Sequence, residues 1–498
     1  GCSLVANQRS PVRSESLSDC SSAWQRRVWV SRRSYSVVPP RWLSARVGRR
    51  VGREQARAVH SLRVGRYWPR LGGSRLACGF RGARAAKVFW GCDVVVRVLV
   101  ADKFWYRRGG TERVIFDEIE WLEAAGHQVA HFSTAHPMNQ PSPWSDYFAP
   151  YLELGVDGRL SASEKALAAA RLFYNREAAR RFTRLLDDFR PDVVHVHNIH
   201  RHISPSIVMV AQRKGVPVVH TLHEYHAVCP SDLLLRDDLS VCQPPRCGGA
   251  NYLPCVRYRC VRGSLAGSAL SALEIFWRNR VLDYPALVDT FISPSAFLAS
   301  VLDRSGWRRR PVRVLPNAVP VGDVGEAGDY FVYAGRLSRE KGVQTAVAAA
   351  AQAGVELIVA GDGPLGEQLR AAAPASVRFT GRLPGEQLDE LLRHALAAVV
   401  PSDCFENAPL AVLEAMAVGR PVIAARTGGI PELVRDGVDG ILVEPGDVES
   451  LGQALRRLHA DRSTADSMGA AARQRVSEAF SPARHLDGLL ATYEAVRQ

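Results

Sequence analysis

The sequence predicts an α/β protein with two parallel-sheet domains. Apolar runs of strand length alternate with stretches of helix length, first from residue 93 to 320 and again from Tyr330 onwards. Several of these runs end in glycine or in a short polar turn, where a parallel sheet presents its ligand-binding edge. A chain of 498 residues, 47% of them apolar, is also long enough to build two or three cores.

Residues 1–92 differ in composition from the rest of the chain. They hold 19 of the 64 lysines and arginines but 3 of the 50 acidic residues, which leaves 45 basic and 47 acidic residues elsewhere. The formal net charge of +14 therefore belongs to this segment, and the rest lacks the basic surface that nucleic-acid binding requires. An Arg-rich leader is compatible with a transit peptide or a nucleic-acid arm. Because it has no apolar periodicity, we expect a disordered extension or translated upstream sequence, and no nucleic-acid partner.

The first α/β segment starts at Asp93. A strand is expected over 94–101, followed by a loop with Gly109-Gly110 and a helix with Thr111 as its N-cap. The two glycines let a ligand approach the backbone, and the helix N-terminus attracts negative charge. The loop lacks the G-x-G-x-x-G fingerprint, which disfavours a dinucleotide-dependent redox enzyme.

One candidate site residue follows in this half. Residues 134–160 are expected to form a loop and 163–189 one long amphipathic helix, before strands at 192–197 and 217–222. His223 follows the second strand, at the edge where ligands of open α/β sheets bind. From the residues alone, a structural and a functional role both stay open.

The ten cysteines are unevenly spread. Four lie in 1–92, five lie between 229 and 260, and Cys404 stands alone. This is not the pattern of a disulfide-stapled secreted domain, so we expect a reducing, cytoplasmic setting. The central five are Cys229, Cys242, Cys247, Cys255 and Cys260. They lack paired C-x-x-C knuckles, which are typical of zinc sites. We therefore favour a cysteine-rich loop that covers the acceptor cleft, and a zinc site is the alternative.

Residues 264–284 carry an apolar stripe with a few basic residues. A core-facing helix and a helix resting on a membrane surface both fit, and we favour the first. No apolar run is long enough to cross a bilayer, and we expect no cleaved signal peptide. Two strands at 288–294 and 312–317 flank a helix from 295 to 302, and the Gly-rich, acidic stretch 320–329 is expected to be a linker.

Strands and helices alternate regularly from Tyr330. The expected strands are 331–335, 356–361, 377–381 and 397–402, and the expected helices begin at Val343, Leu365 and Glu386. This alternation predicts a parallel sheet with helices on both faces. The chain closes with helices near 447–459, 464–479 and 482–496.

Residues 402–429 hold the densest set of candidate residues. Glu406 and Glu414 stand eight positions apart, with Pro409 expected in the first turn of a short apolar helix. A carboxylate on such a helix can accept hydrogen bonds from ribose hydroxyls, and free N–H groups near Leu410 favour phosphate. Taken alone, this spacing is more typical of solvated helix charges.

The surrounding motifs resemble those of retaining, nucleotide-sugar-dependent glycosyltransferases of the GT-B fold (group 1, family 4 type), whose signature is Glu, seven residues, Glu. The other motifs, in family order, are the Thr-x-His strand end at 221–223, LPNAV at 315–319, GRLSREKG at 335–342, GDGP at 361–364, GRL at 381–383 and GGIPE at 428–432. One departure is that Asn407-Ala408-Pro409-Leu410 replaces the usual Pro-Phe-Gly-Leu, with both glutamates still in register.

This resemblance covers about residues 95–497 and implies two Rossmann-like domains facing a central cleft. The expected divisions are a basic extension at 1–92, an N-terminal acceptor domain at 93–320, a C-terminal donor domain at 321–480, and a helix at 481–498 that crosses back to the first domain.

The resemblance also implies the reaction and its residues. A sugar passes from a nucleoside diphosphate to an acceptor hydroxyl with retention, by front-face attack that the departing phosphate assists, without a glycosidase-type carboxylate pair. The catalytic residues would be His223, Arg336, Lys341 and Glu406, with the two cations neutralising the diphosphate without a metal or other cofactor. The donor-binding positions would be Gly109, Gly110, Gly335, Gly361, Gly363, Arg382, Leu383, Leu410, Ala411 and Glu414, the last holding the ribose.

The expected partners are the nucleotide-sugar donor and a saccharide or lipid-linked acceptor in polysaccharide or glycoconjugate assembly. We expect a cytoplasmic protein, with peripheral contact at the inner membrane face as an option. A nucleotide-sugar 2-epimerase of the same fold and an inactive binding homologue remain alternatives. The sequence does not specify the sugar, the base, the acceptor or the oligomeric state.

Overall fold

The computed structural model describes residues 95–498, except for 152–160, 243–245, 249–250 and 308–309. The extension predicted for residues 1–92 lies outside the described residues. Within the described part, no helix has the length and apolar character needed to cross a membrane.

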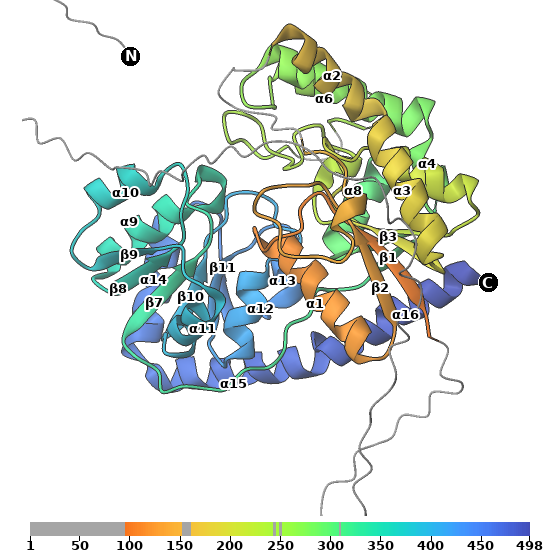
Figure 1. The fold of residues 1–498 in the computed structure, drawn as a ribbon. Coiled ribbons are helices and arrows are strands. Elements are labelled where there is room, and N and C mark those ends of the chain that lie inside the picture. The colour runs from red at the N-terminus through yellow and green to blue at the C-terminus, as the bar shows by residue number, and fades with distance from the viewer. Residues whose placement is uncertain (1–94, 152–160, 243–245, 249–250, 308–309) are drawn as a thin grey trace, which may run out of the picture. The chain divides into compact units, whose positions relative to one another are not determined.

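The first half of the described chain builds one parallel sheet of six strands (Figure 1). Their spatial order is β2-β1-β3-β4-β5-β6, and every pairing is parallel. The strands are β1 (Arg97–Ala101), β2 (Gln128–Phe132), β3 (Val193–Val196), β4 (Val218–Thr221), β5 (Thr290–Ser293) and β6 (Val312–Val314). The helices are α1 (Gly110–Ala124), α2 (Ala162–Phe173), α3 (Arg176–Phe189), α4 (Ser206–Arg213), α5 (Leu253–Arg257), α6 (Leu265–Phe276), α7 (Tyr284–Leu287) and α8 (Ala296–Arg304), with short turns η1 (Ser145–Tyr147), η2 (Tyr225–Ala227) and the π-helical η3 (Trp277–Val281).

Helices cover both faces of this sheet. Val98 of β1 belongs to a buried cluster with Ile119 of α1 and Tyr493 of α16 (Pro482–Arg497). Leu99, the next residue, belongs to a different cluster with Phe182 of α3. Successive side chains of a strand point to opposite faces, so these two clusters are the two sides of one sheet.

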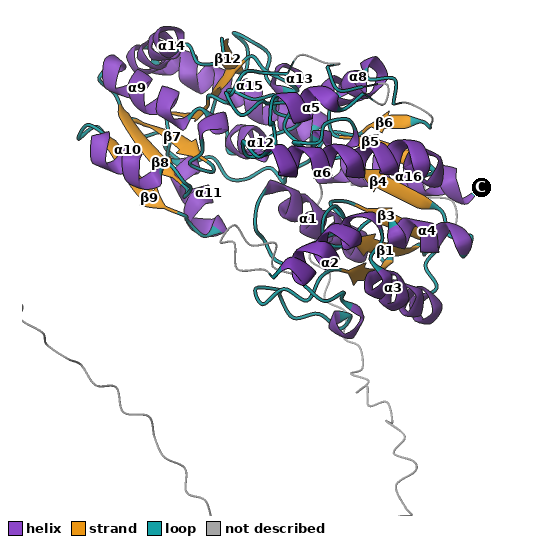
Figure 2. Ribbon diagram, turned by 90° about the horizontal axis from the view of Figure 1, so that it is seen from above, coloured by secondary structure: helices purple, strands orange, loops and turns teal. Residues whose placement is uncertain are grey.

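The second half repeats this arrangement. Its sheet has the order β12-β11-β10-β7-β8-β9, again parallel. Figure 2 labels β7, β8, β9 and β12 of this sheet. The strands are β7 (Tyr330–Ala334), β8 (Glu356–Ala360), β9 (Val377–Gly381), β10 (Ala397–Val400), β11 (Val422–Ala425) and β12 (Gly440–Val443). The helices are α9 (Val343–Ala353), α10 (Gly366–Ala372), α11 (Gly385–Arg393), α12 (Leu410–Ala417), α13 (Ile430–Leu433), α14 (Val448–Ala460) and α15 (Arg462–Ala479), with a 3-10 turn η4 (Arg339–Lys341). The predicted α/β class with two parallel sheets is confirmed.

The last helix returns to the first sheet. α15 packs on α12 of the second half, whereas α16 contacts α1, β3 and β4. Tyr493 of α16 is fully buried, and its hydroxyl lies 2.8 Å from Nδ1 of His195 on β3. The two consecutive helices therefore connect the two sheets.

Two local predictions were wrong. The helix expected over 163–189 is two helices, because Asn175 caps α3 by accepting a hydrogen bond from the Ala178 amide at 3.1 Å. Thr111 is not an N-cap, since α1 begins at Gly110 and Gly109 occupies the cap position.

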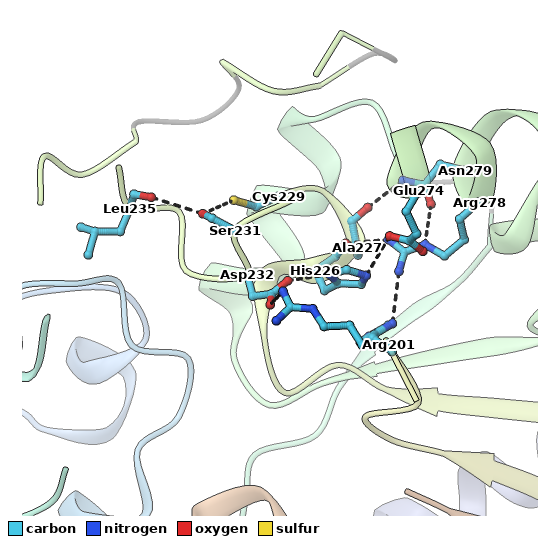
Figure 3. A network of polar contacts seen from close by, with 11 residues as sticks. Arg201, His226, Ala227, Cys229, Ser231, Asp232, Leu235, Glu274, Arg278 and Asn279 are labelled. Carbon is cyan, nitrogen blue, oxygen red and sulfur yellow. Dashed lines mark hydrogen bonds and ion pairs between the residues drawn. The ribbon is translucent and has the colours of Figure 1, made fainter. Parts of the chain in front are cut away.

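The helix expected over 264–284 ends as an α-helix at Phe276 and continues as the π-helical turn η3. Arg278 in this turn is buried, and its Nη2 donates to the His226 carbonyl at 2.6 Å. Figure 3 shows His226 between two carboxylates, with Asp232 2.5 Å from Nδ1 and Glu274 3.3 Å from Nε2. These contacts hold the loop after β4 against the helix. Ala272 and Ile275 are buried, whereas Leu265, Leu273 and Phe276 are exposed, so the predicted core-facing position holds for only one side of the helix.

Candidate functional site

Lys341 and Glu406 form an ion pair at the carboxyl edge of the second sheet. Lys341 ends η4, which follows β7, and Glu406 lies in the loop between β10 and α12. The Lys341 Nζ lies 2.7 Å from Oε1 of Glu406, which also accepts a hydrogen bond from the Ser402 hydroxyl at 2.6 Å. Glu406 is 9% exposed, while the Lys341 side chain keeps 35% of its surface in solvent. The carboxylate is therefore enclosed, while part of the Lys341 side chain stays in contact with solvent.

Each member of this pair keeps the other charged. Burial alone would raise the pKa of Glu406, but the charge of Lys341 and the hydrogen bonds from Lys341 and Ser402 hold it below its usual value. Burial alone would lower the pKa of Lys341, but the charge of Glu406 raises it above its usual value. An ammonium has three N–H donors and Glu406 takes one, so the others can bind a further anion.

Close backbone contacts hold this pair in place. A Cβ on Gly342 would lie 1.9 Å from the carbonyl oxygen of Pro401, so the turn after η4 packs directly on the end of β10. A Cβ on Gly428 would lie 2.0 Å from the carbonyl oxygen of Glu406, to which the Gly429 amide donates at 2.7 Å. Only glycine permits these approaches.

Arg336 lies on a glycine-lined edge of the same sheet. A Cβ on Gly361 would lie 1.8 Å from the carbonyl oxygen of Gly335, and a Cβ on Gly363 would lie 2.5 Å from that of Leu337. The loop after β7 and the loop after β8, which both carry predicted donor-binding glycines, are thus in direct backbone contact. Arg336 is exposed, and its guanidinium takes part in none of the ion pairs found among the described residues.

The glycine loop before α1 meets the start of α12. A Cβ on Gly110 would lie 3.8 Å from Cδ1 of Leu410, which is buried. Arg382, which follows β9, donates through Nη2 to the carbonyls of Arg107 at 2.9 Å and Arg108 at 3.1 Å. The other predicted donor positions here are Gly109, which is exposed, and Leu383 and Ala411, which are half-buried. The structure thus brings predicted donor-site residues from both halves together.

Glu414 contacts a residue that the sequence reasoning missed. Its Oε1 lies 3.1 Å from Nη1 of Arg113 on α1, and its side chain is 13% exposed. Burial raises the pKa of Glu414 above its usual value, and Arg113 opposes that shift. The place of Arg113 on the first turn after Gly109-Gly110 is the signal that could have identified it.

His223 is held by a second histidine. Its Nε2 lies 2.9 Å from Nδ1 of His197, the residue directly after β3. Burial, with a smaller effect of Lys103, lowers the pKa of His223 to about 3, so the ring is neutral near pH 7. Because Nε2 is engaged by His197, Nδ1 is the ring nitrogen left for another partner.

A buried polar group includes His197. Oε2 of Glu118 lies 3.8 Å from His195 Nδ1 and 3.7 Å from His197 Nε2, and its Oε1 lies 3.0 Å from His485 Nε2. Among the described residues, Glu118, His195 and His197 are the group whose potential metal-ligand atoms lie within 4.8 Å of one another. Burial lowers the pKa of both His195 and His197 well below the usual value. Burial would also lower the pKa of His485, but its contact with Glu118 raises it, which makes His485 the charge partner of Glu118.

Asn407 joins the signature loop to the first half. Its Nδ2 donates to the carbonyls of Leu222 at 3.1 Å and His223 at 3.3 Å, and its Oδ1 accepts from the Ser295 hydroxyl at 2.6 Å. Tyr225 adds a hydrogen bond from its hydroxyl to the Glu406 carbonyl at 3.3 Å. Asn407, which departs from the family motif, thus connects the two halves of the chain. This departure was the signal by which the sequence could have identified the contact.

The five central cysteines follow His223 and Tyr225 in the chain. Cys229, Cys242, Cys247, Cys255 and Cys260 line one pocket in the first half of the chain, and all five are free.

Two family models match the chain. Residues 109–318 match the glycosyl transferase 4-like domain, and residues 321–475 match the glycosyl transferases group 1. Together they include every predicted site residue.

Curated relatives and a solved structure agree with these matches. A glycogen synthase of Mycobacterium tuberculosis is 28% identical over 405 residues, which is 75% of this chain and 87% of the relative. The sulfoquinovosyl transferase SQD2 of Arabidopsis thaliana is 43% identical over 120 residues, so the match spans 23% of each chain. The structure of Anabaena Alr3699/HepE in complex with UDP superposes with a TM-score of 0.53 at 18% identity, over 80% of this chain and all of the other, which shows a shared fold.

Proposed function

The chain belongs to the group 1 glycosyltransferases with the GT-B fold, and from this premise we propose that it transfers a sugar from a nucleoside diphosphate to an acceptor hydroxyl, with retention at the anomeric carbon. The UDP in the structure of the Anabaena protein supports a nucleotide-sugar donor. The glycogen synthase among the relatives supports a saccharide acceptor in polysaccharide or glycoconjugate assembly.

The observation that carries the proposal is the ion pair of Lys341 with Glu406. Its carboxylate is buried and the Lys341 side chain is partly exposed, at the carboxyl edge of a parallel sheet. Ligands of open α/β sheets bind beyond this edge. Because Glu406 keeps the ammonium charged and fixed, Lys341 can receive an anion without first being oriented.

Arg336 and Lys341 are proposed to neutralise the leaving diphosphate. As the bond from the anomeric carbon to the diphosphate oxygen breaks, negative charge grows on that oxygen. A forked guanidinium and a point-like ammonium stabilise this charge, and a charged hydrogen bond contributes about 1.5–3 kcal/mol. With two cations in place, we propose no metal for the transfer step.

The remaining groups are proposed to hold the donor and the acceptor. Glu406 contacts sugar hydroxyls through the oxygen that Lys341 leaves free, and Glu414, oriented by Arg113, accepts hydrogen bonds from the ribose. His223 contacts the sugar or the acceptor as a neutral ring. In front-face attack, the acceptor oxygen bonds to the anomeric carbon on the side that the diphosphate leaves. The acceptor proton passes to the departing phosphate oxygen.

A donor screen followed by two matched variants tests the proposal. UDP-, GDP-, ADP- and dTDP-sugars are compared by thermal shift, and the donor that stabilises the chain is used in transfer assays. Arg336→Ala is expected to lower kcat/KM by about 10²–10³-fold, the usual cost of one preorganised donor. Arg339→Ala, an exposed arginine three positions on, serves as the control and is expected to keep wild-type activity.

Two outcomes would count against the proposal. Equal activity of Arg336→Ala, Lys341→Ala and the control would remove both cations from the mechanism. Release of free nucleotide at the same rate with and without an acceptor, together with a changed sugar configuration at C2, would identify a 2-epimerase.

A further inference from the structure

Five thiols that the sequence spreads over 32 positions meet at one pocket. Its lining contains Cys229, Cys242, Cys247, Cys255 and Cys260, with two serines, two leucines and one arginine. The empty volume there is about 350 Å³, part of which is open solvent. The lining holds no carboxylate and no imidazole, so sulfur is its dominant metal-binding atom.

Short turns bring these residues together. The Cys229 amide donates to the Tyr225 carbonyl at 2.8 Å, and the Cys242 amide donates to the Leu234 carbonyl at 2.7 Å. The Cys260 amide donates to the Cys255 carbonyl at 3.1 Å, which places these two residues on one turn. Figure 3 shows the Cys229 sulfur in contact with the Ser231 hydroxyl, and the two atoms are 3.2 Å apart.

This segment has little apolar core of its own. Its described residues between 229 and 263 add no strand to either sheet and one helix, α5. The buried cluster here is small, with Tyr252 packing on Ala272 and Ile275 of α6, whereas Leu253 is 74% exposed. Segments with so little buried apolar surface are commonly held by disulfides or by a metal ion.

The surroundings favour a metal over free thiols. A site with four thiolates around a divalent ion carries two net negative charges, and Arg246 on the lining supplies a compensating positive charge. Thiolate ligands select zinc over the hard cations Mg²⁺ and Ca²⁺.

We propose that this pocket binds one zinc ion through four of its five cysteine sulfurs. Among the described residues, no three of these sulfurs lie within 4.8 Å of one another, so the sulfurs must move closer together to bind the ion. Each coordinating thiol releases its proton to solvent as the Zn–S bond forms. Zinc then orders the segment that begins six residues after His223, and it takes no part in the transfer chemistry.

Metal analysis of the full chain tests this. The protein is purified without chelators, and zinc is measured by mass spectrometry in the wild type and in five single Cys→Ser variants. We expect about one zinc per wild-type chain, close to zero in four variants, and retention in the fifth. Cys404→Ser, which removes a buried cysteine outside the pocket, is the control and is expected to keep its zinc.

A second measurement covers variants that fail to fold. Wild-type protein loaded with Co²⁺ is expected to show the intense visible bands and the sulfur-to-metal charge-transfer band of a tetrahedral thiolate site. Zinc-free protein with five titratable thiols, a disulfide among these cysteines, or zinc content unchanged in all five variants would overturn the proposal. So would a cobalt spectrum without thiolate bands.

Discussion

Single residues in this chain act through partners from the other half. Asn407 lies in the second half, yet its side chain binds two carbonyls after β4 and the hydroxyl of Ser295. Glu414 pairs with Arg113, and Arg382 binds the loop before α1. The charged and amide groups of the signature stretch therefore serve both as candidate ligand contacts and as links between the two sheets.

Replacing Asn407 with Ala is expected to destabilise the protein. The change leaves buried carbonyls and the Ser295 hydroxyl without their partner, which costs about 1–3 kcal/mol. Denaturant unfolding measures this loss. Combined with Ser295→Ala in a double-mutant cycle, the two changes should be non-additive because the residues are in direct contact. Simple additivity would show that the contact contributes nothing.

At the scale of elements, turns between strand and helix position the candidate site. Gly342 and Gly354 cap the two ends of α9, and both have left-handed backbone angles, with φ +65° and +70°. Their surroundings differ, because a Cβ on Gly342 would meet the Pro401 carbonyl at 1.9 Å while a Cβ on Gly354 would meet nothing within 4 Å. Gly354 is needed only for its left-handed backbone conformation, whereas Gly342 is also needed for close packing against Pro401.

This difference predicts unequal effects of two matched substitutions. Gly354→Ala is expected to cost about 1–2 kcal/mol, the strain of a left-handed alanine. Gly342→Ala carries the same strain and must also displace the end of β10, so it should cost at least about 2 kcal/mol more. It should also weaken donor binding, because Lys341 moves with the turn. Thermal unfolding and donor titration measure both effects, and equal losses in the two variants would contradict this explanation.

At the scale of the whole described chain, buried histidines set its response to pH. Burial lowers the pKa of His131 and His220 to about 3 and that of His202 to about 4. An unfolded histidine titrates near 6.5, so the unfolded chain binds more protons below that pH and stability falls with acidification. His485 acts in the opposite direction, because its pKa is raised and its contribution is lost as pH rises through the folded value.

His131→Gln tests this pH dependence. The wild-type ring stacks on Trp105 at 3.5 Å between ring centres and is buried, so it resists protonation. Acidification from pH 7 to pH 5 lowers the unfolding free energy of the wild type. In the variant this decrease should be smaller by up to about 2 kcal/mol, because one histidine contributes about 1.4 kcal/mol per pH unit. His459→Gln, at an exposed position on α14, is the control. Identical pH slopes for both variants and the wild type would contradict the assignment.

Much of the fold follows from the sequence by itself. The strand and helix alternation, the parallel sheets and the glycine loops at their edges depend on apolar periodicity and on turn residues, which act over a few neighbouring positions. The loops that carry Lys341 and Glu406 were identified by their resemblance to the family motifs, because their spacing alone is more typical of solvated charges. The local signals missed the break at Asn175, because its cap includes the distant Ser204, whose hydroxyl accepts from the Asn175 amide at 2.9 Å.

The partners of the candidate site residues were decided only by the tertiary structure. Arg113 with Glu414, His197 with His223, and Asn407 with the end of β4 are contacts between residues far apart in the sequence. Such pairs leave no periodic pattern, since their proximity depends on how whole sheets and helices pack. The convergence of the five cysteines has the same cause: irregular turns, rather than a repeating spacing, place them around one pocket.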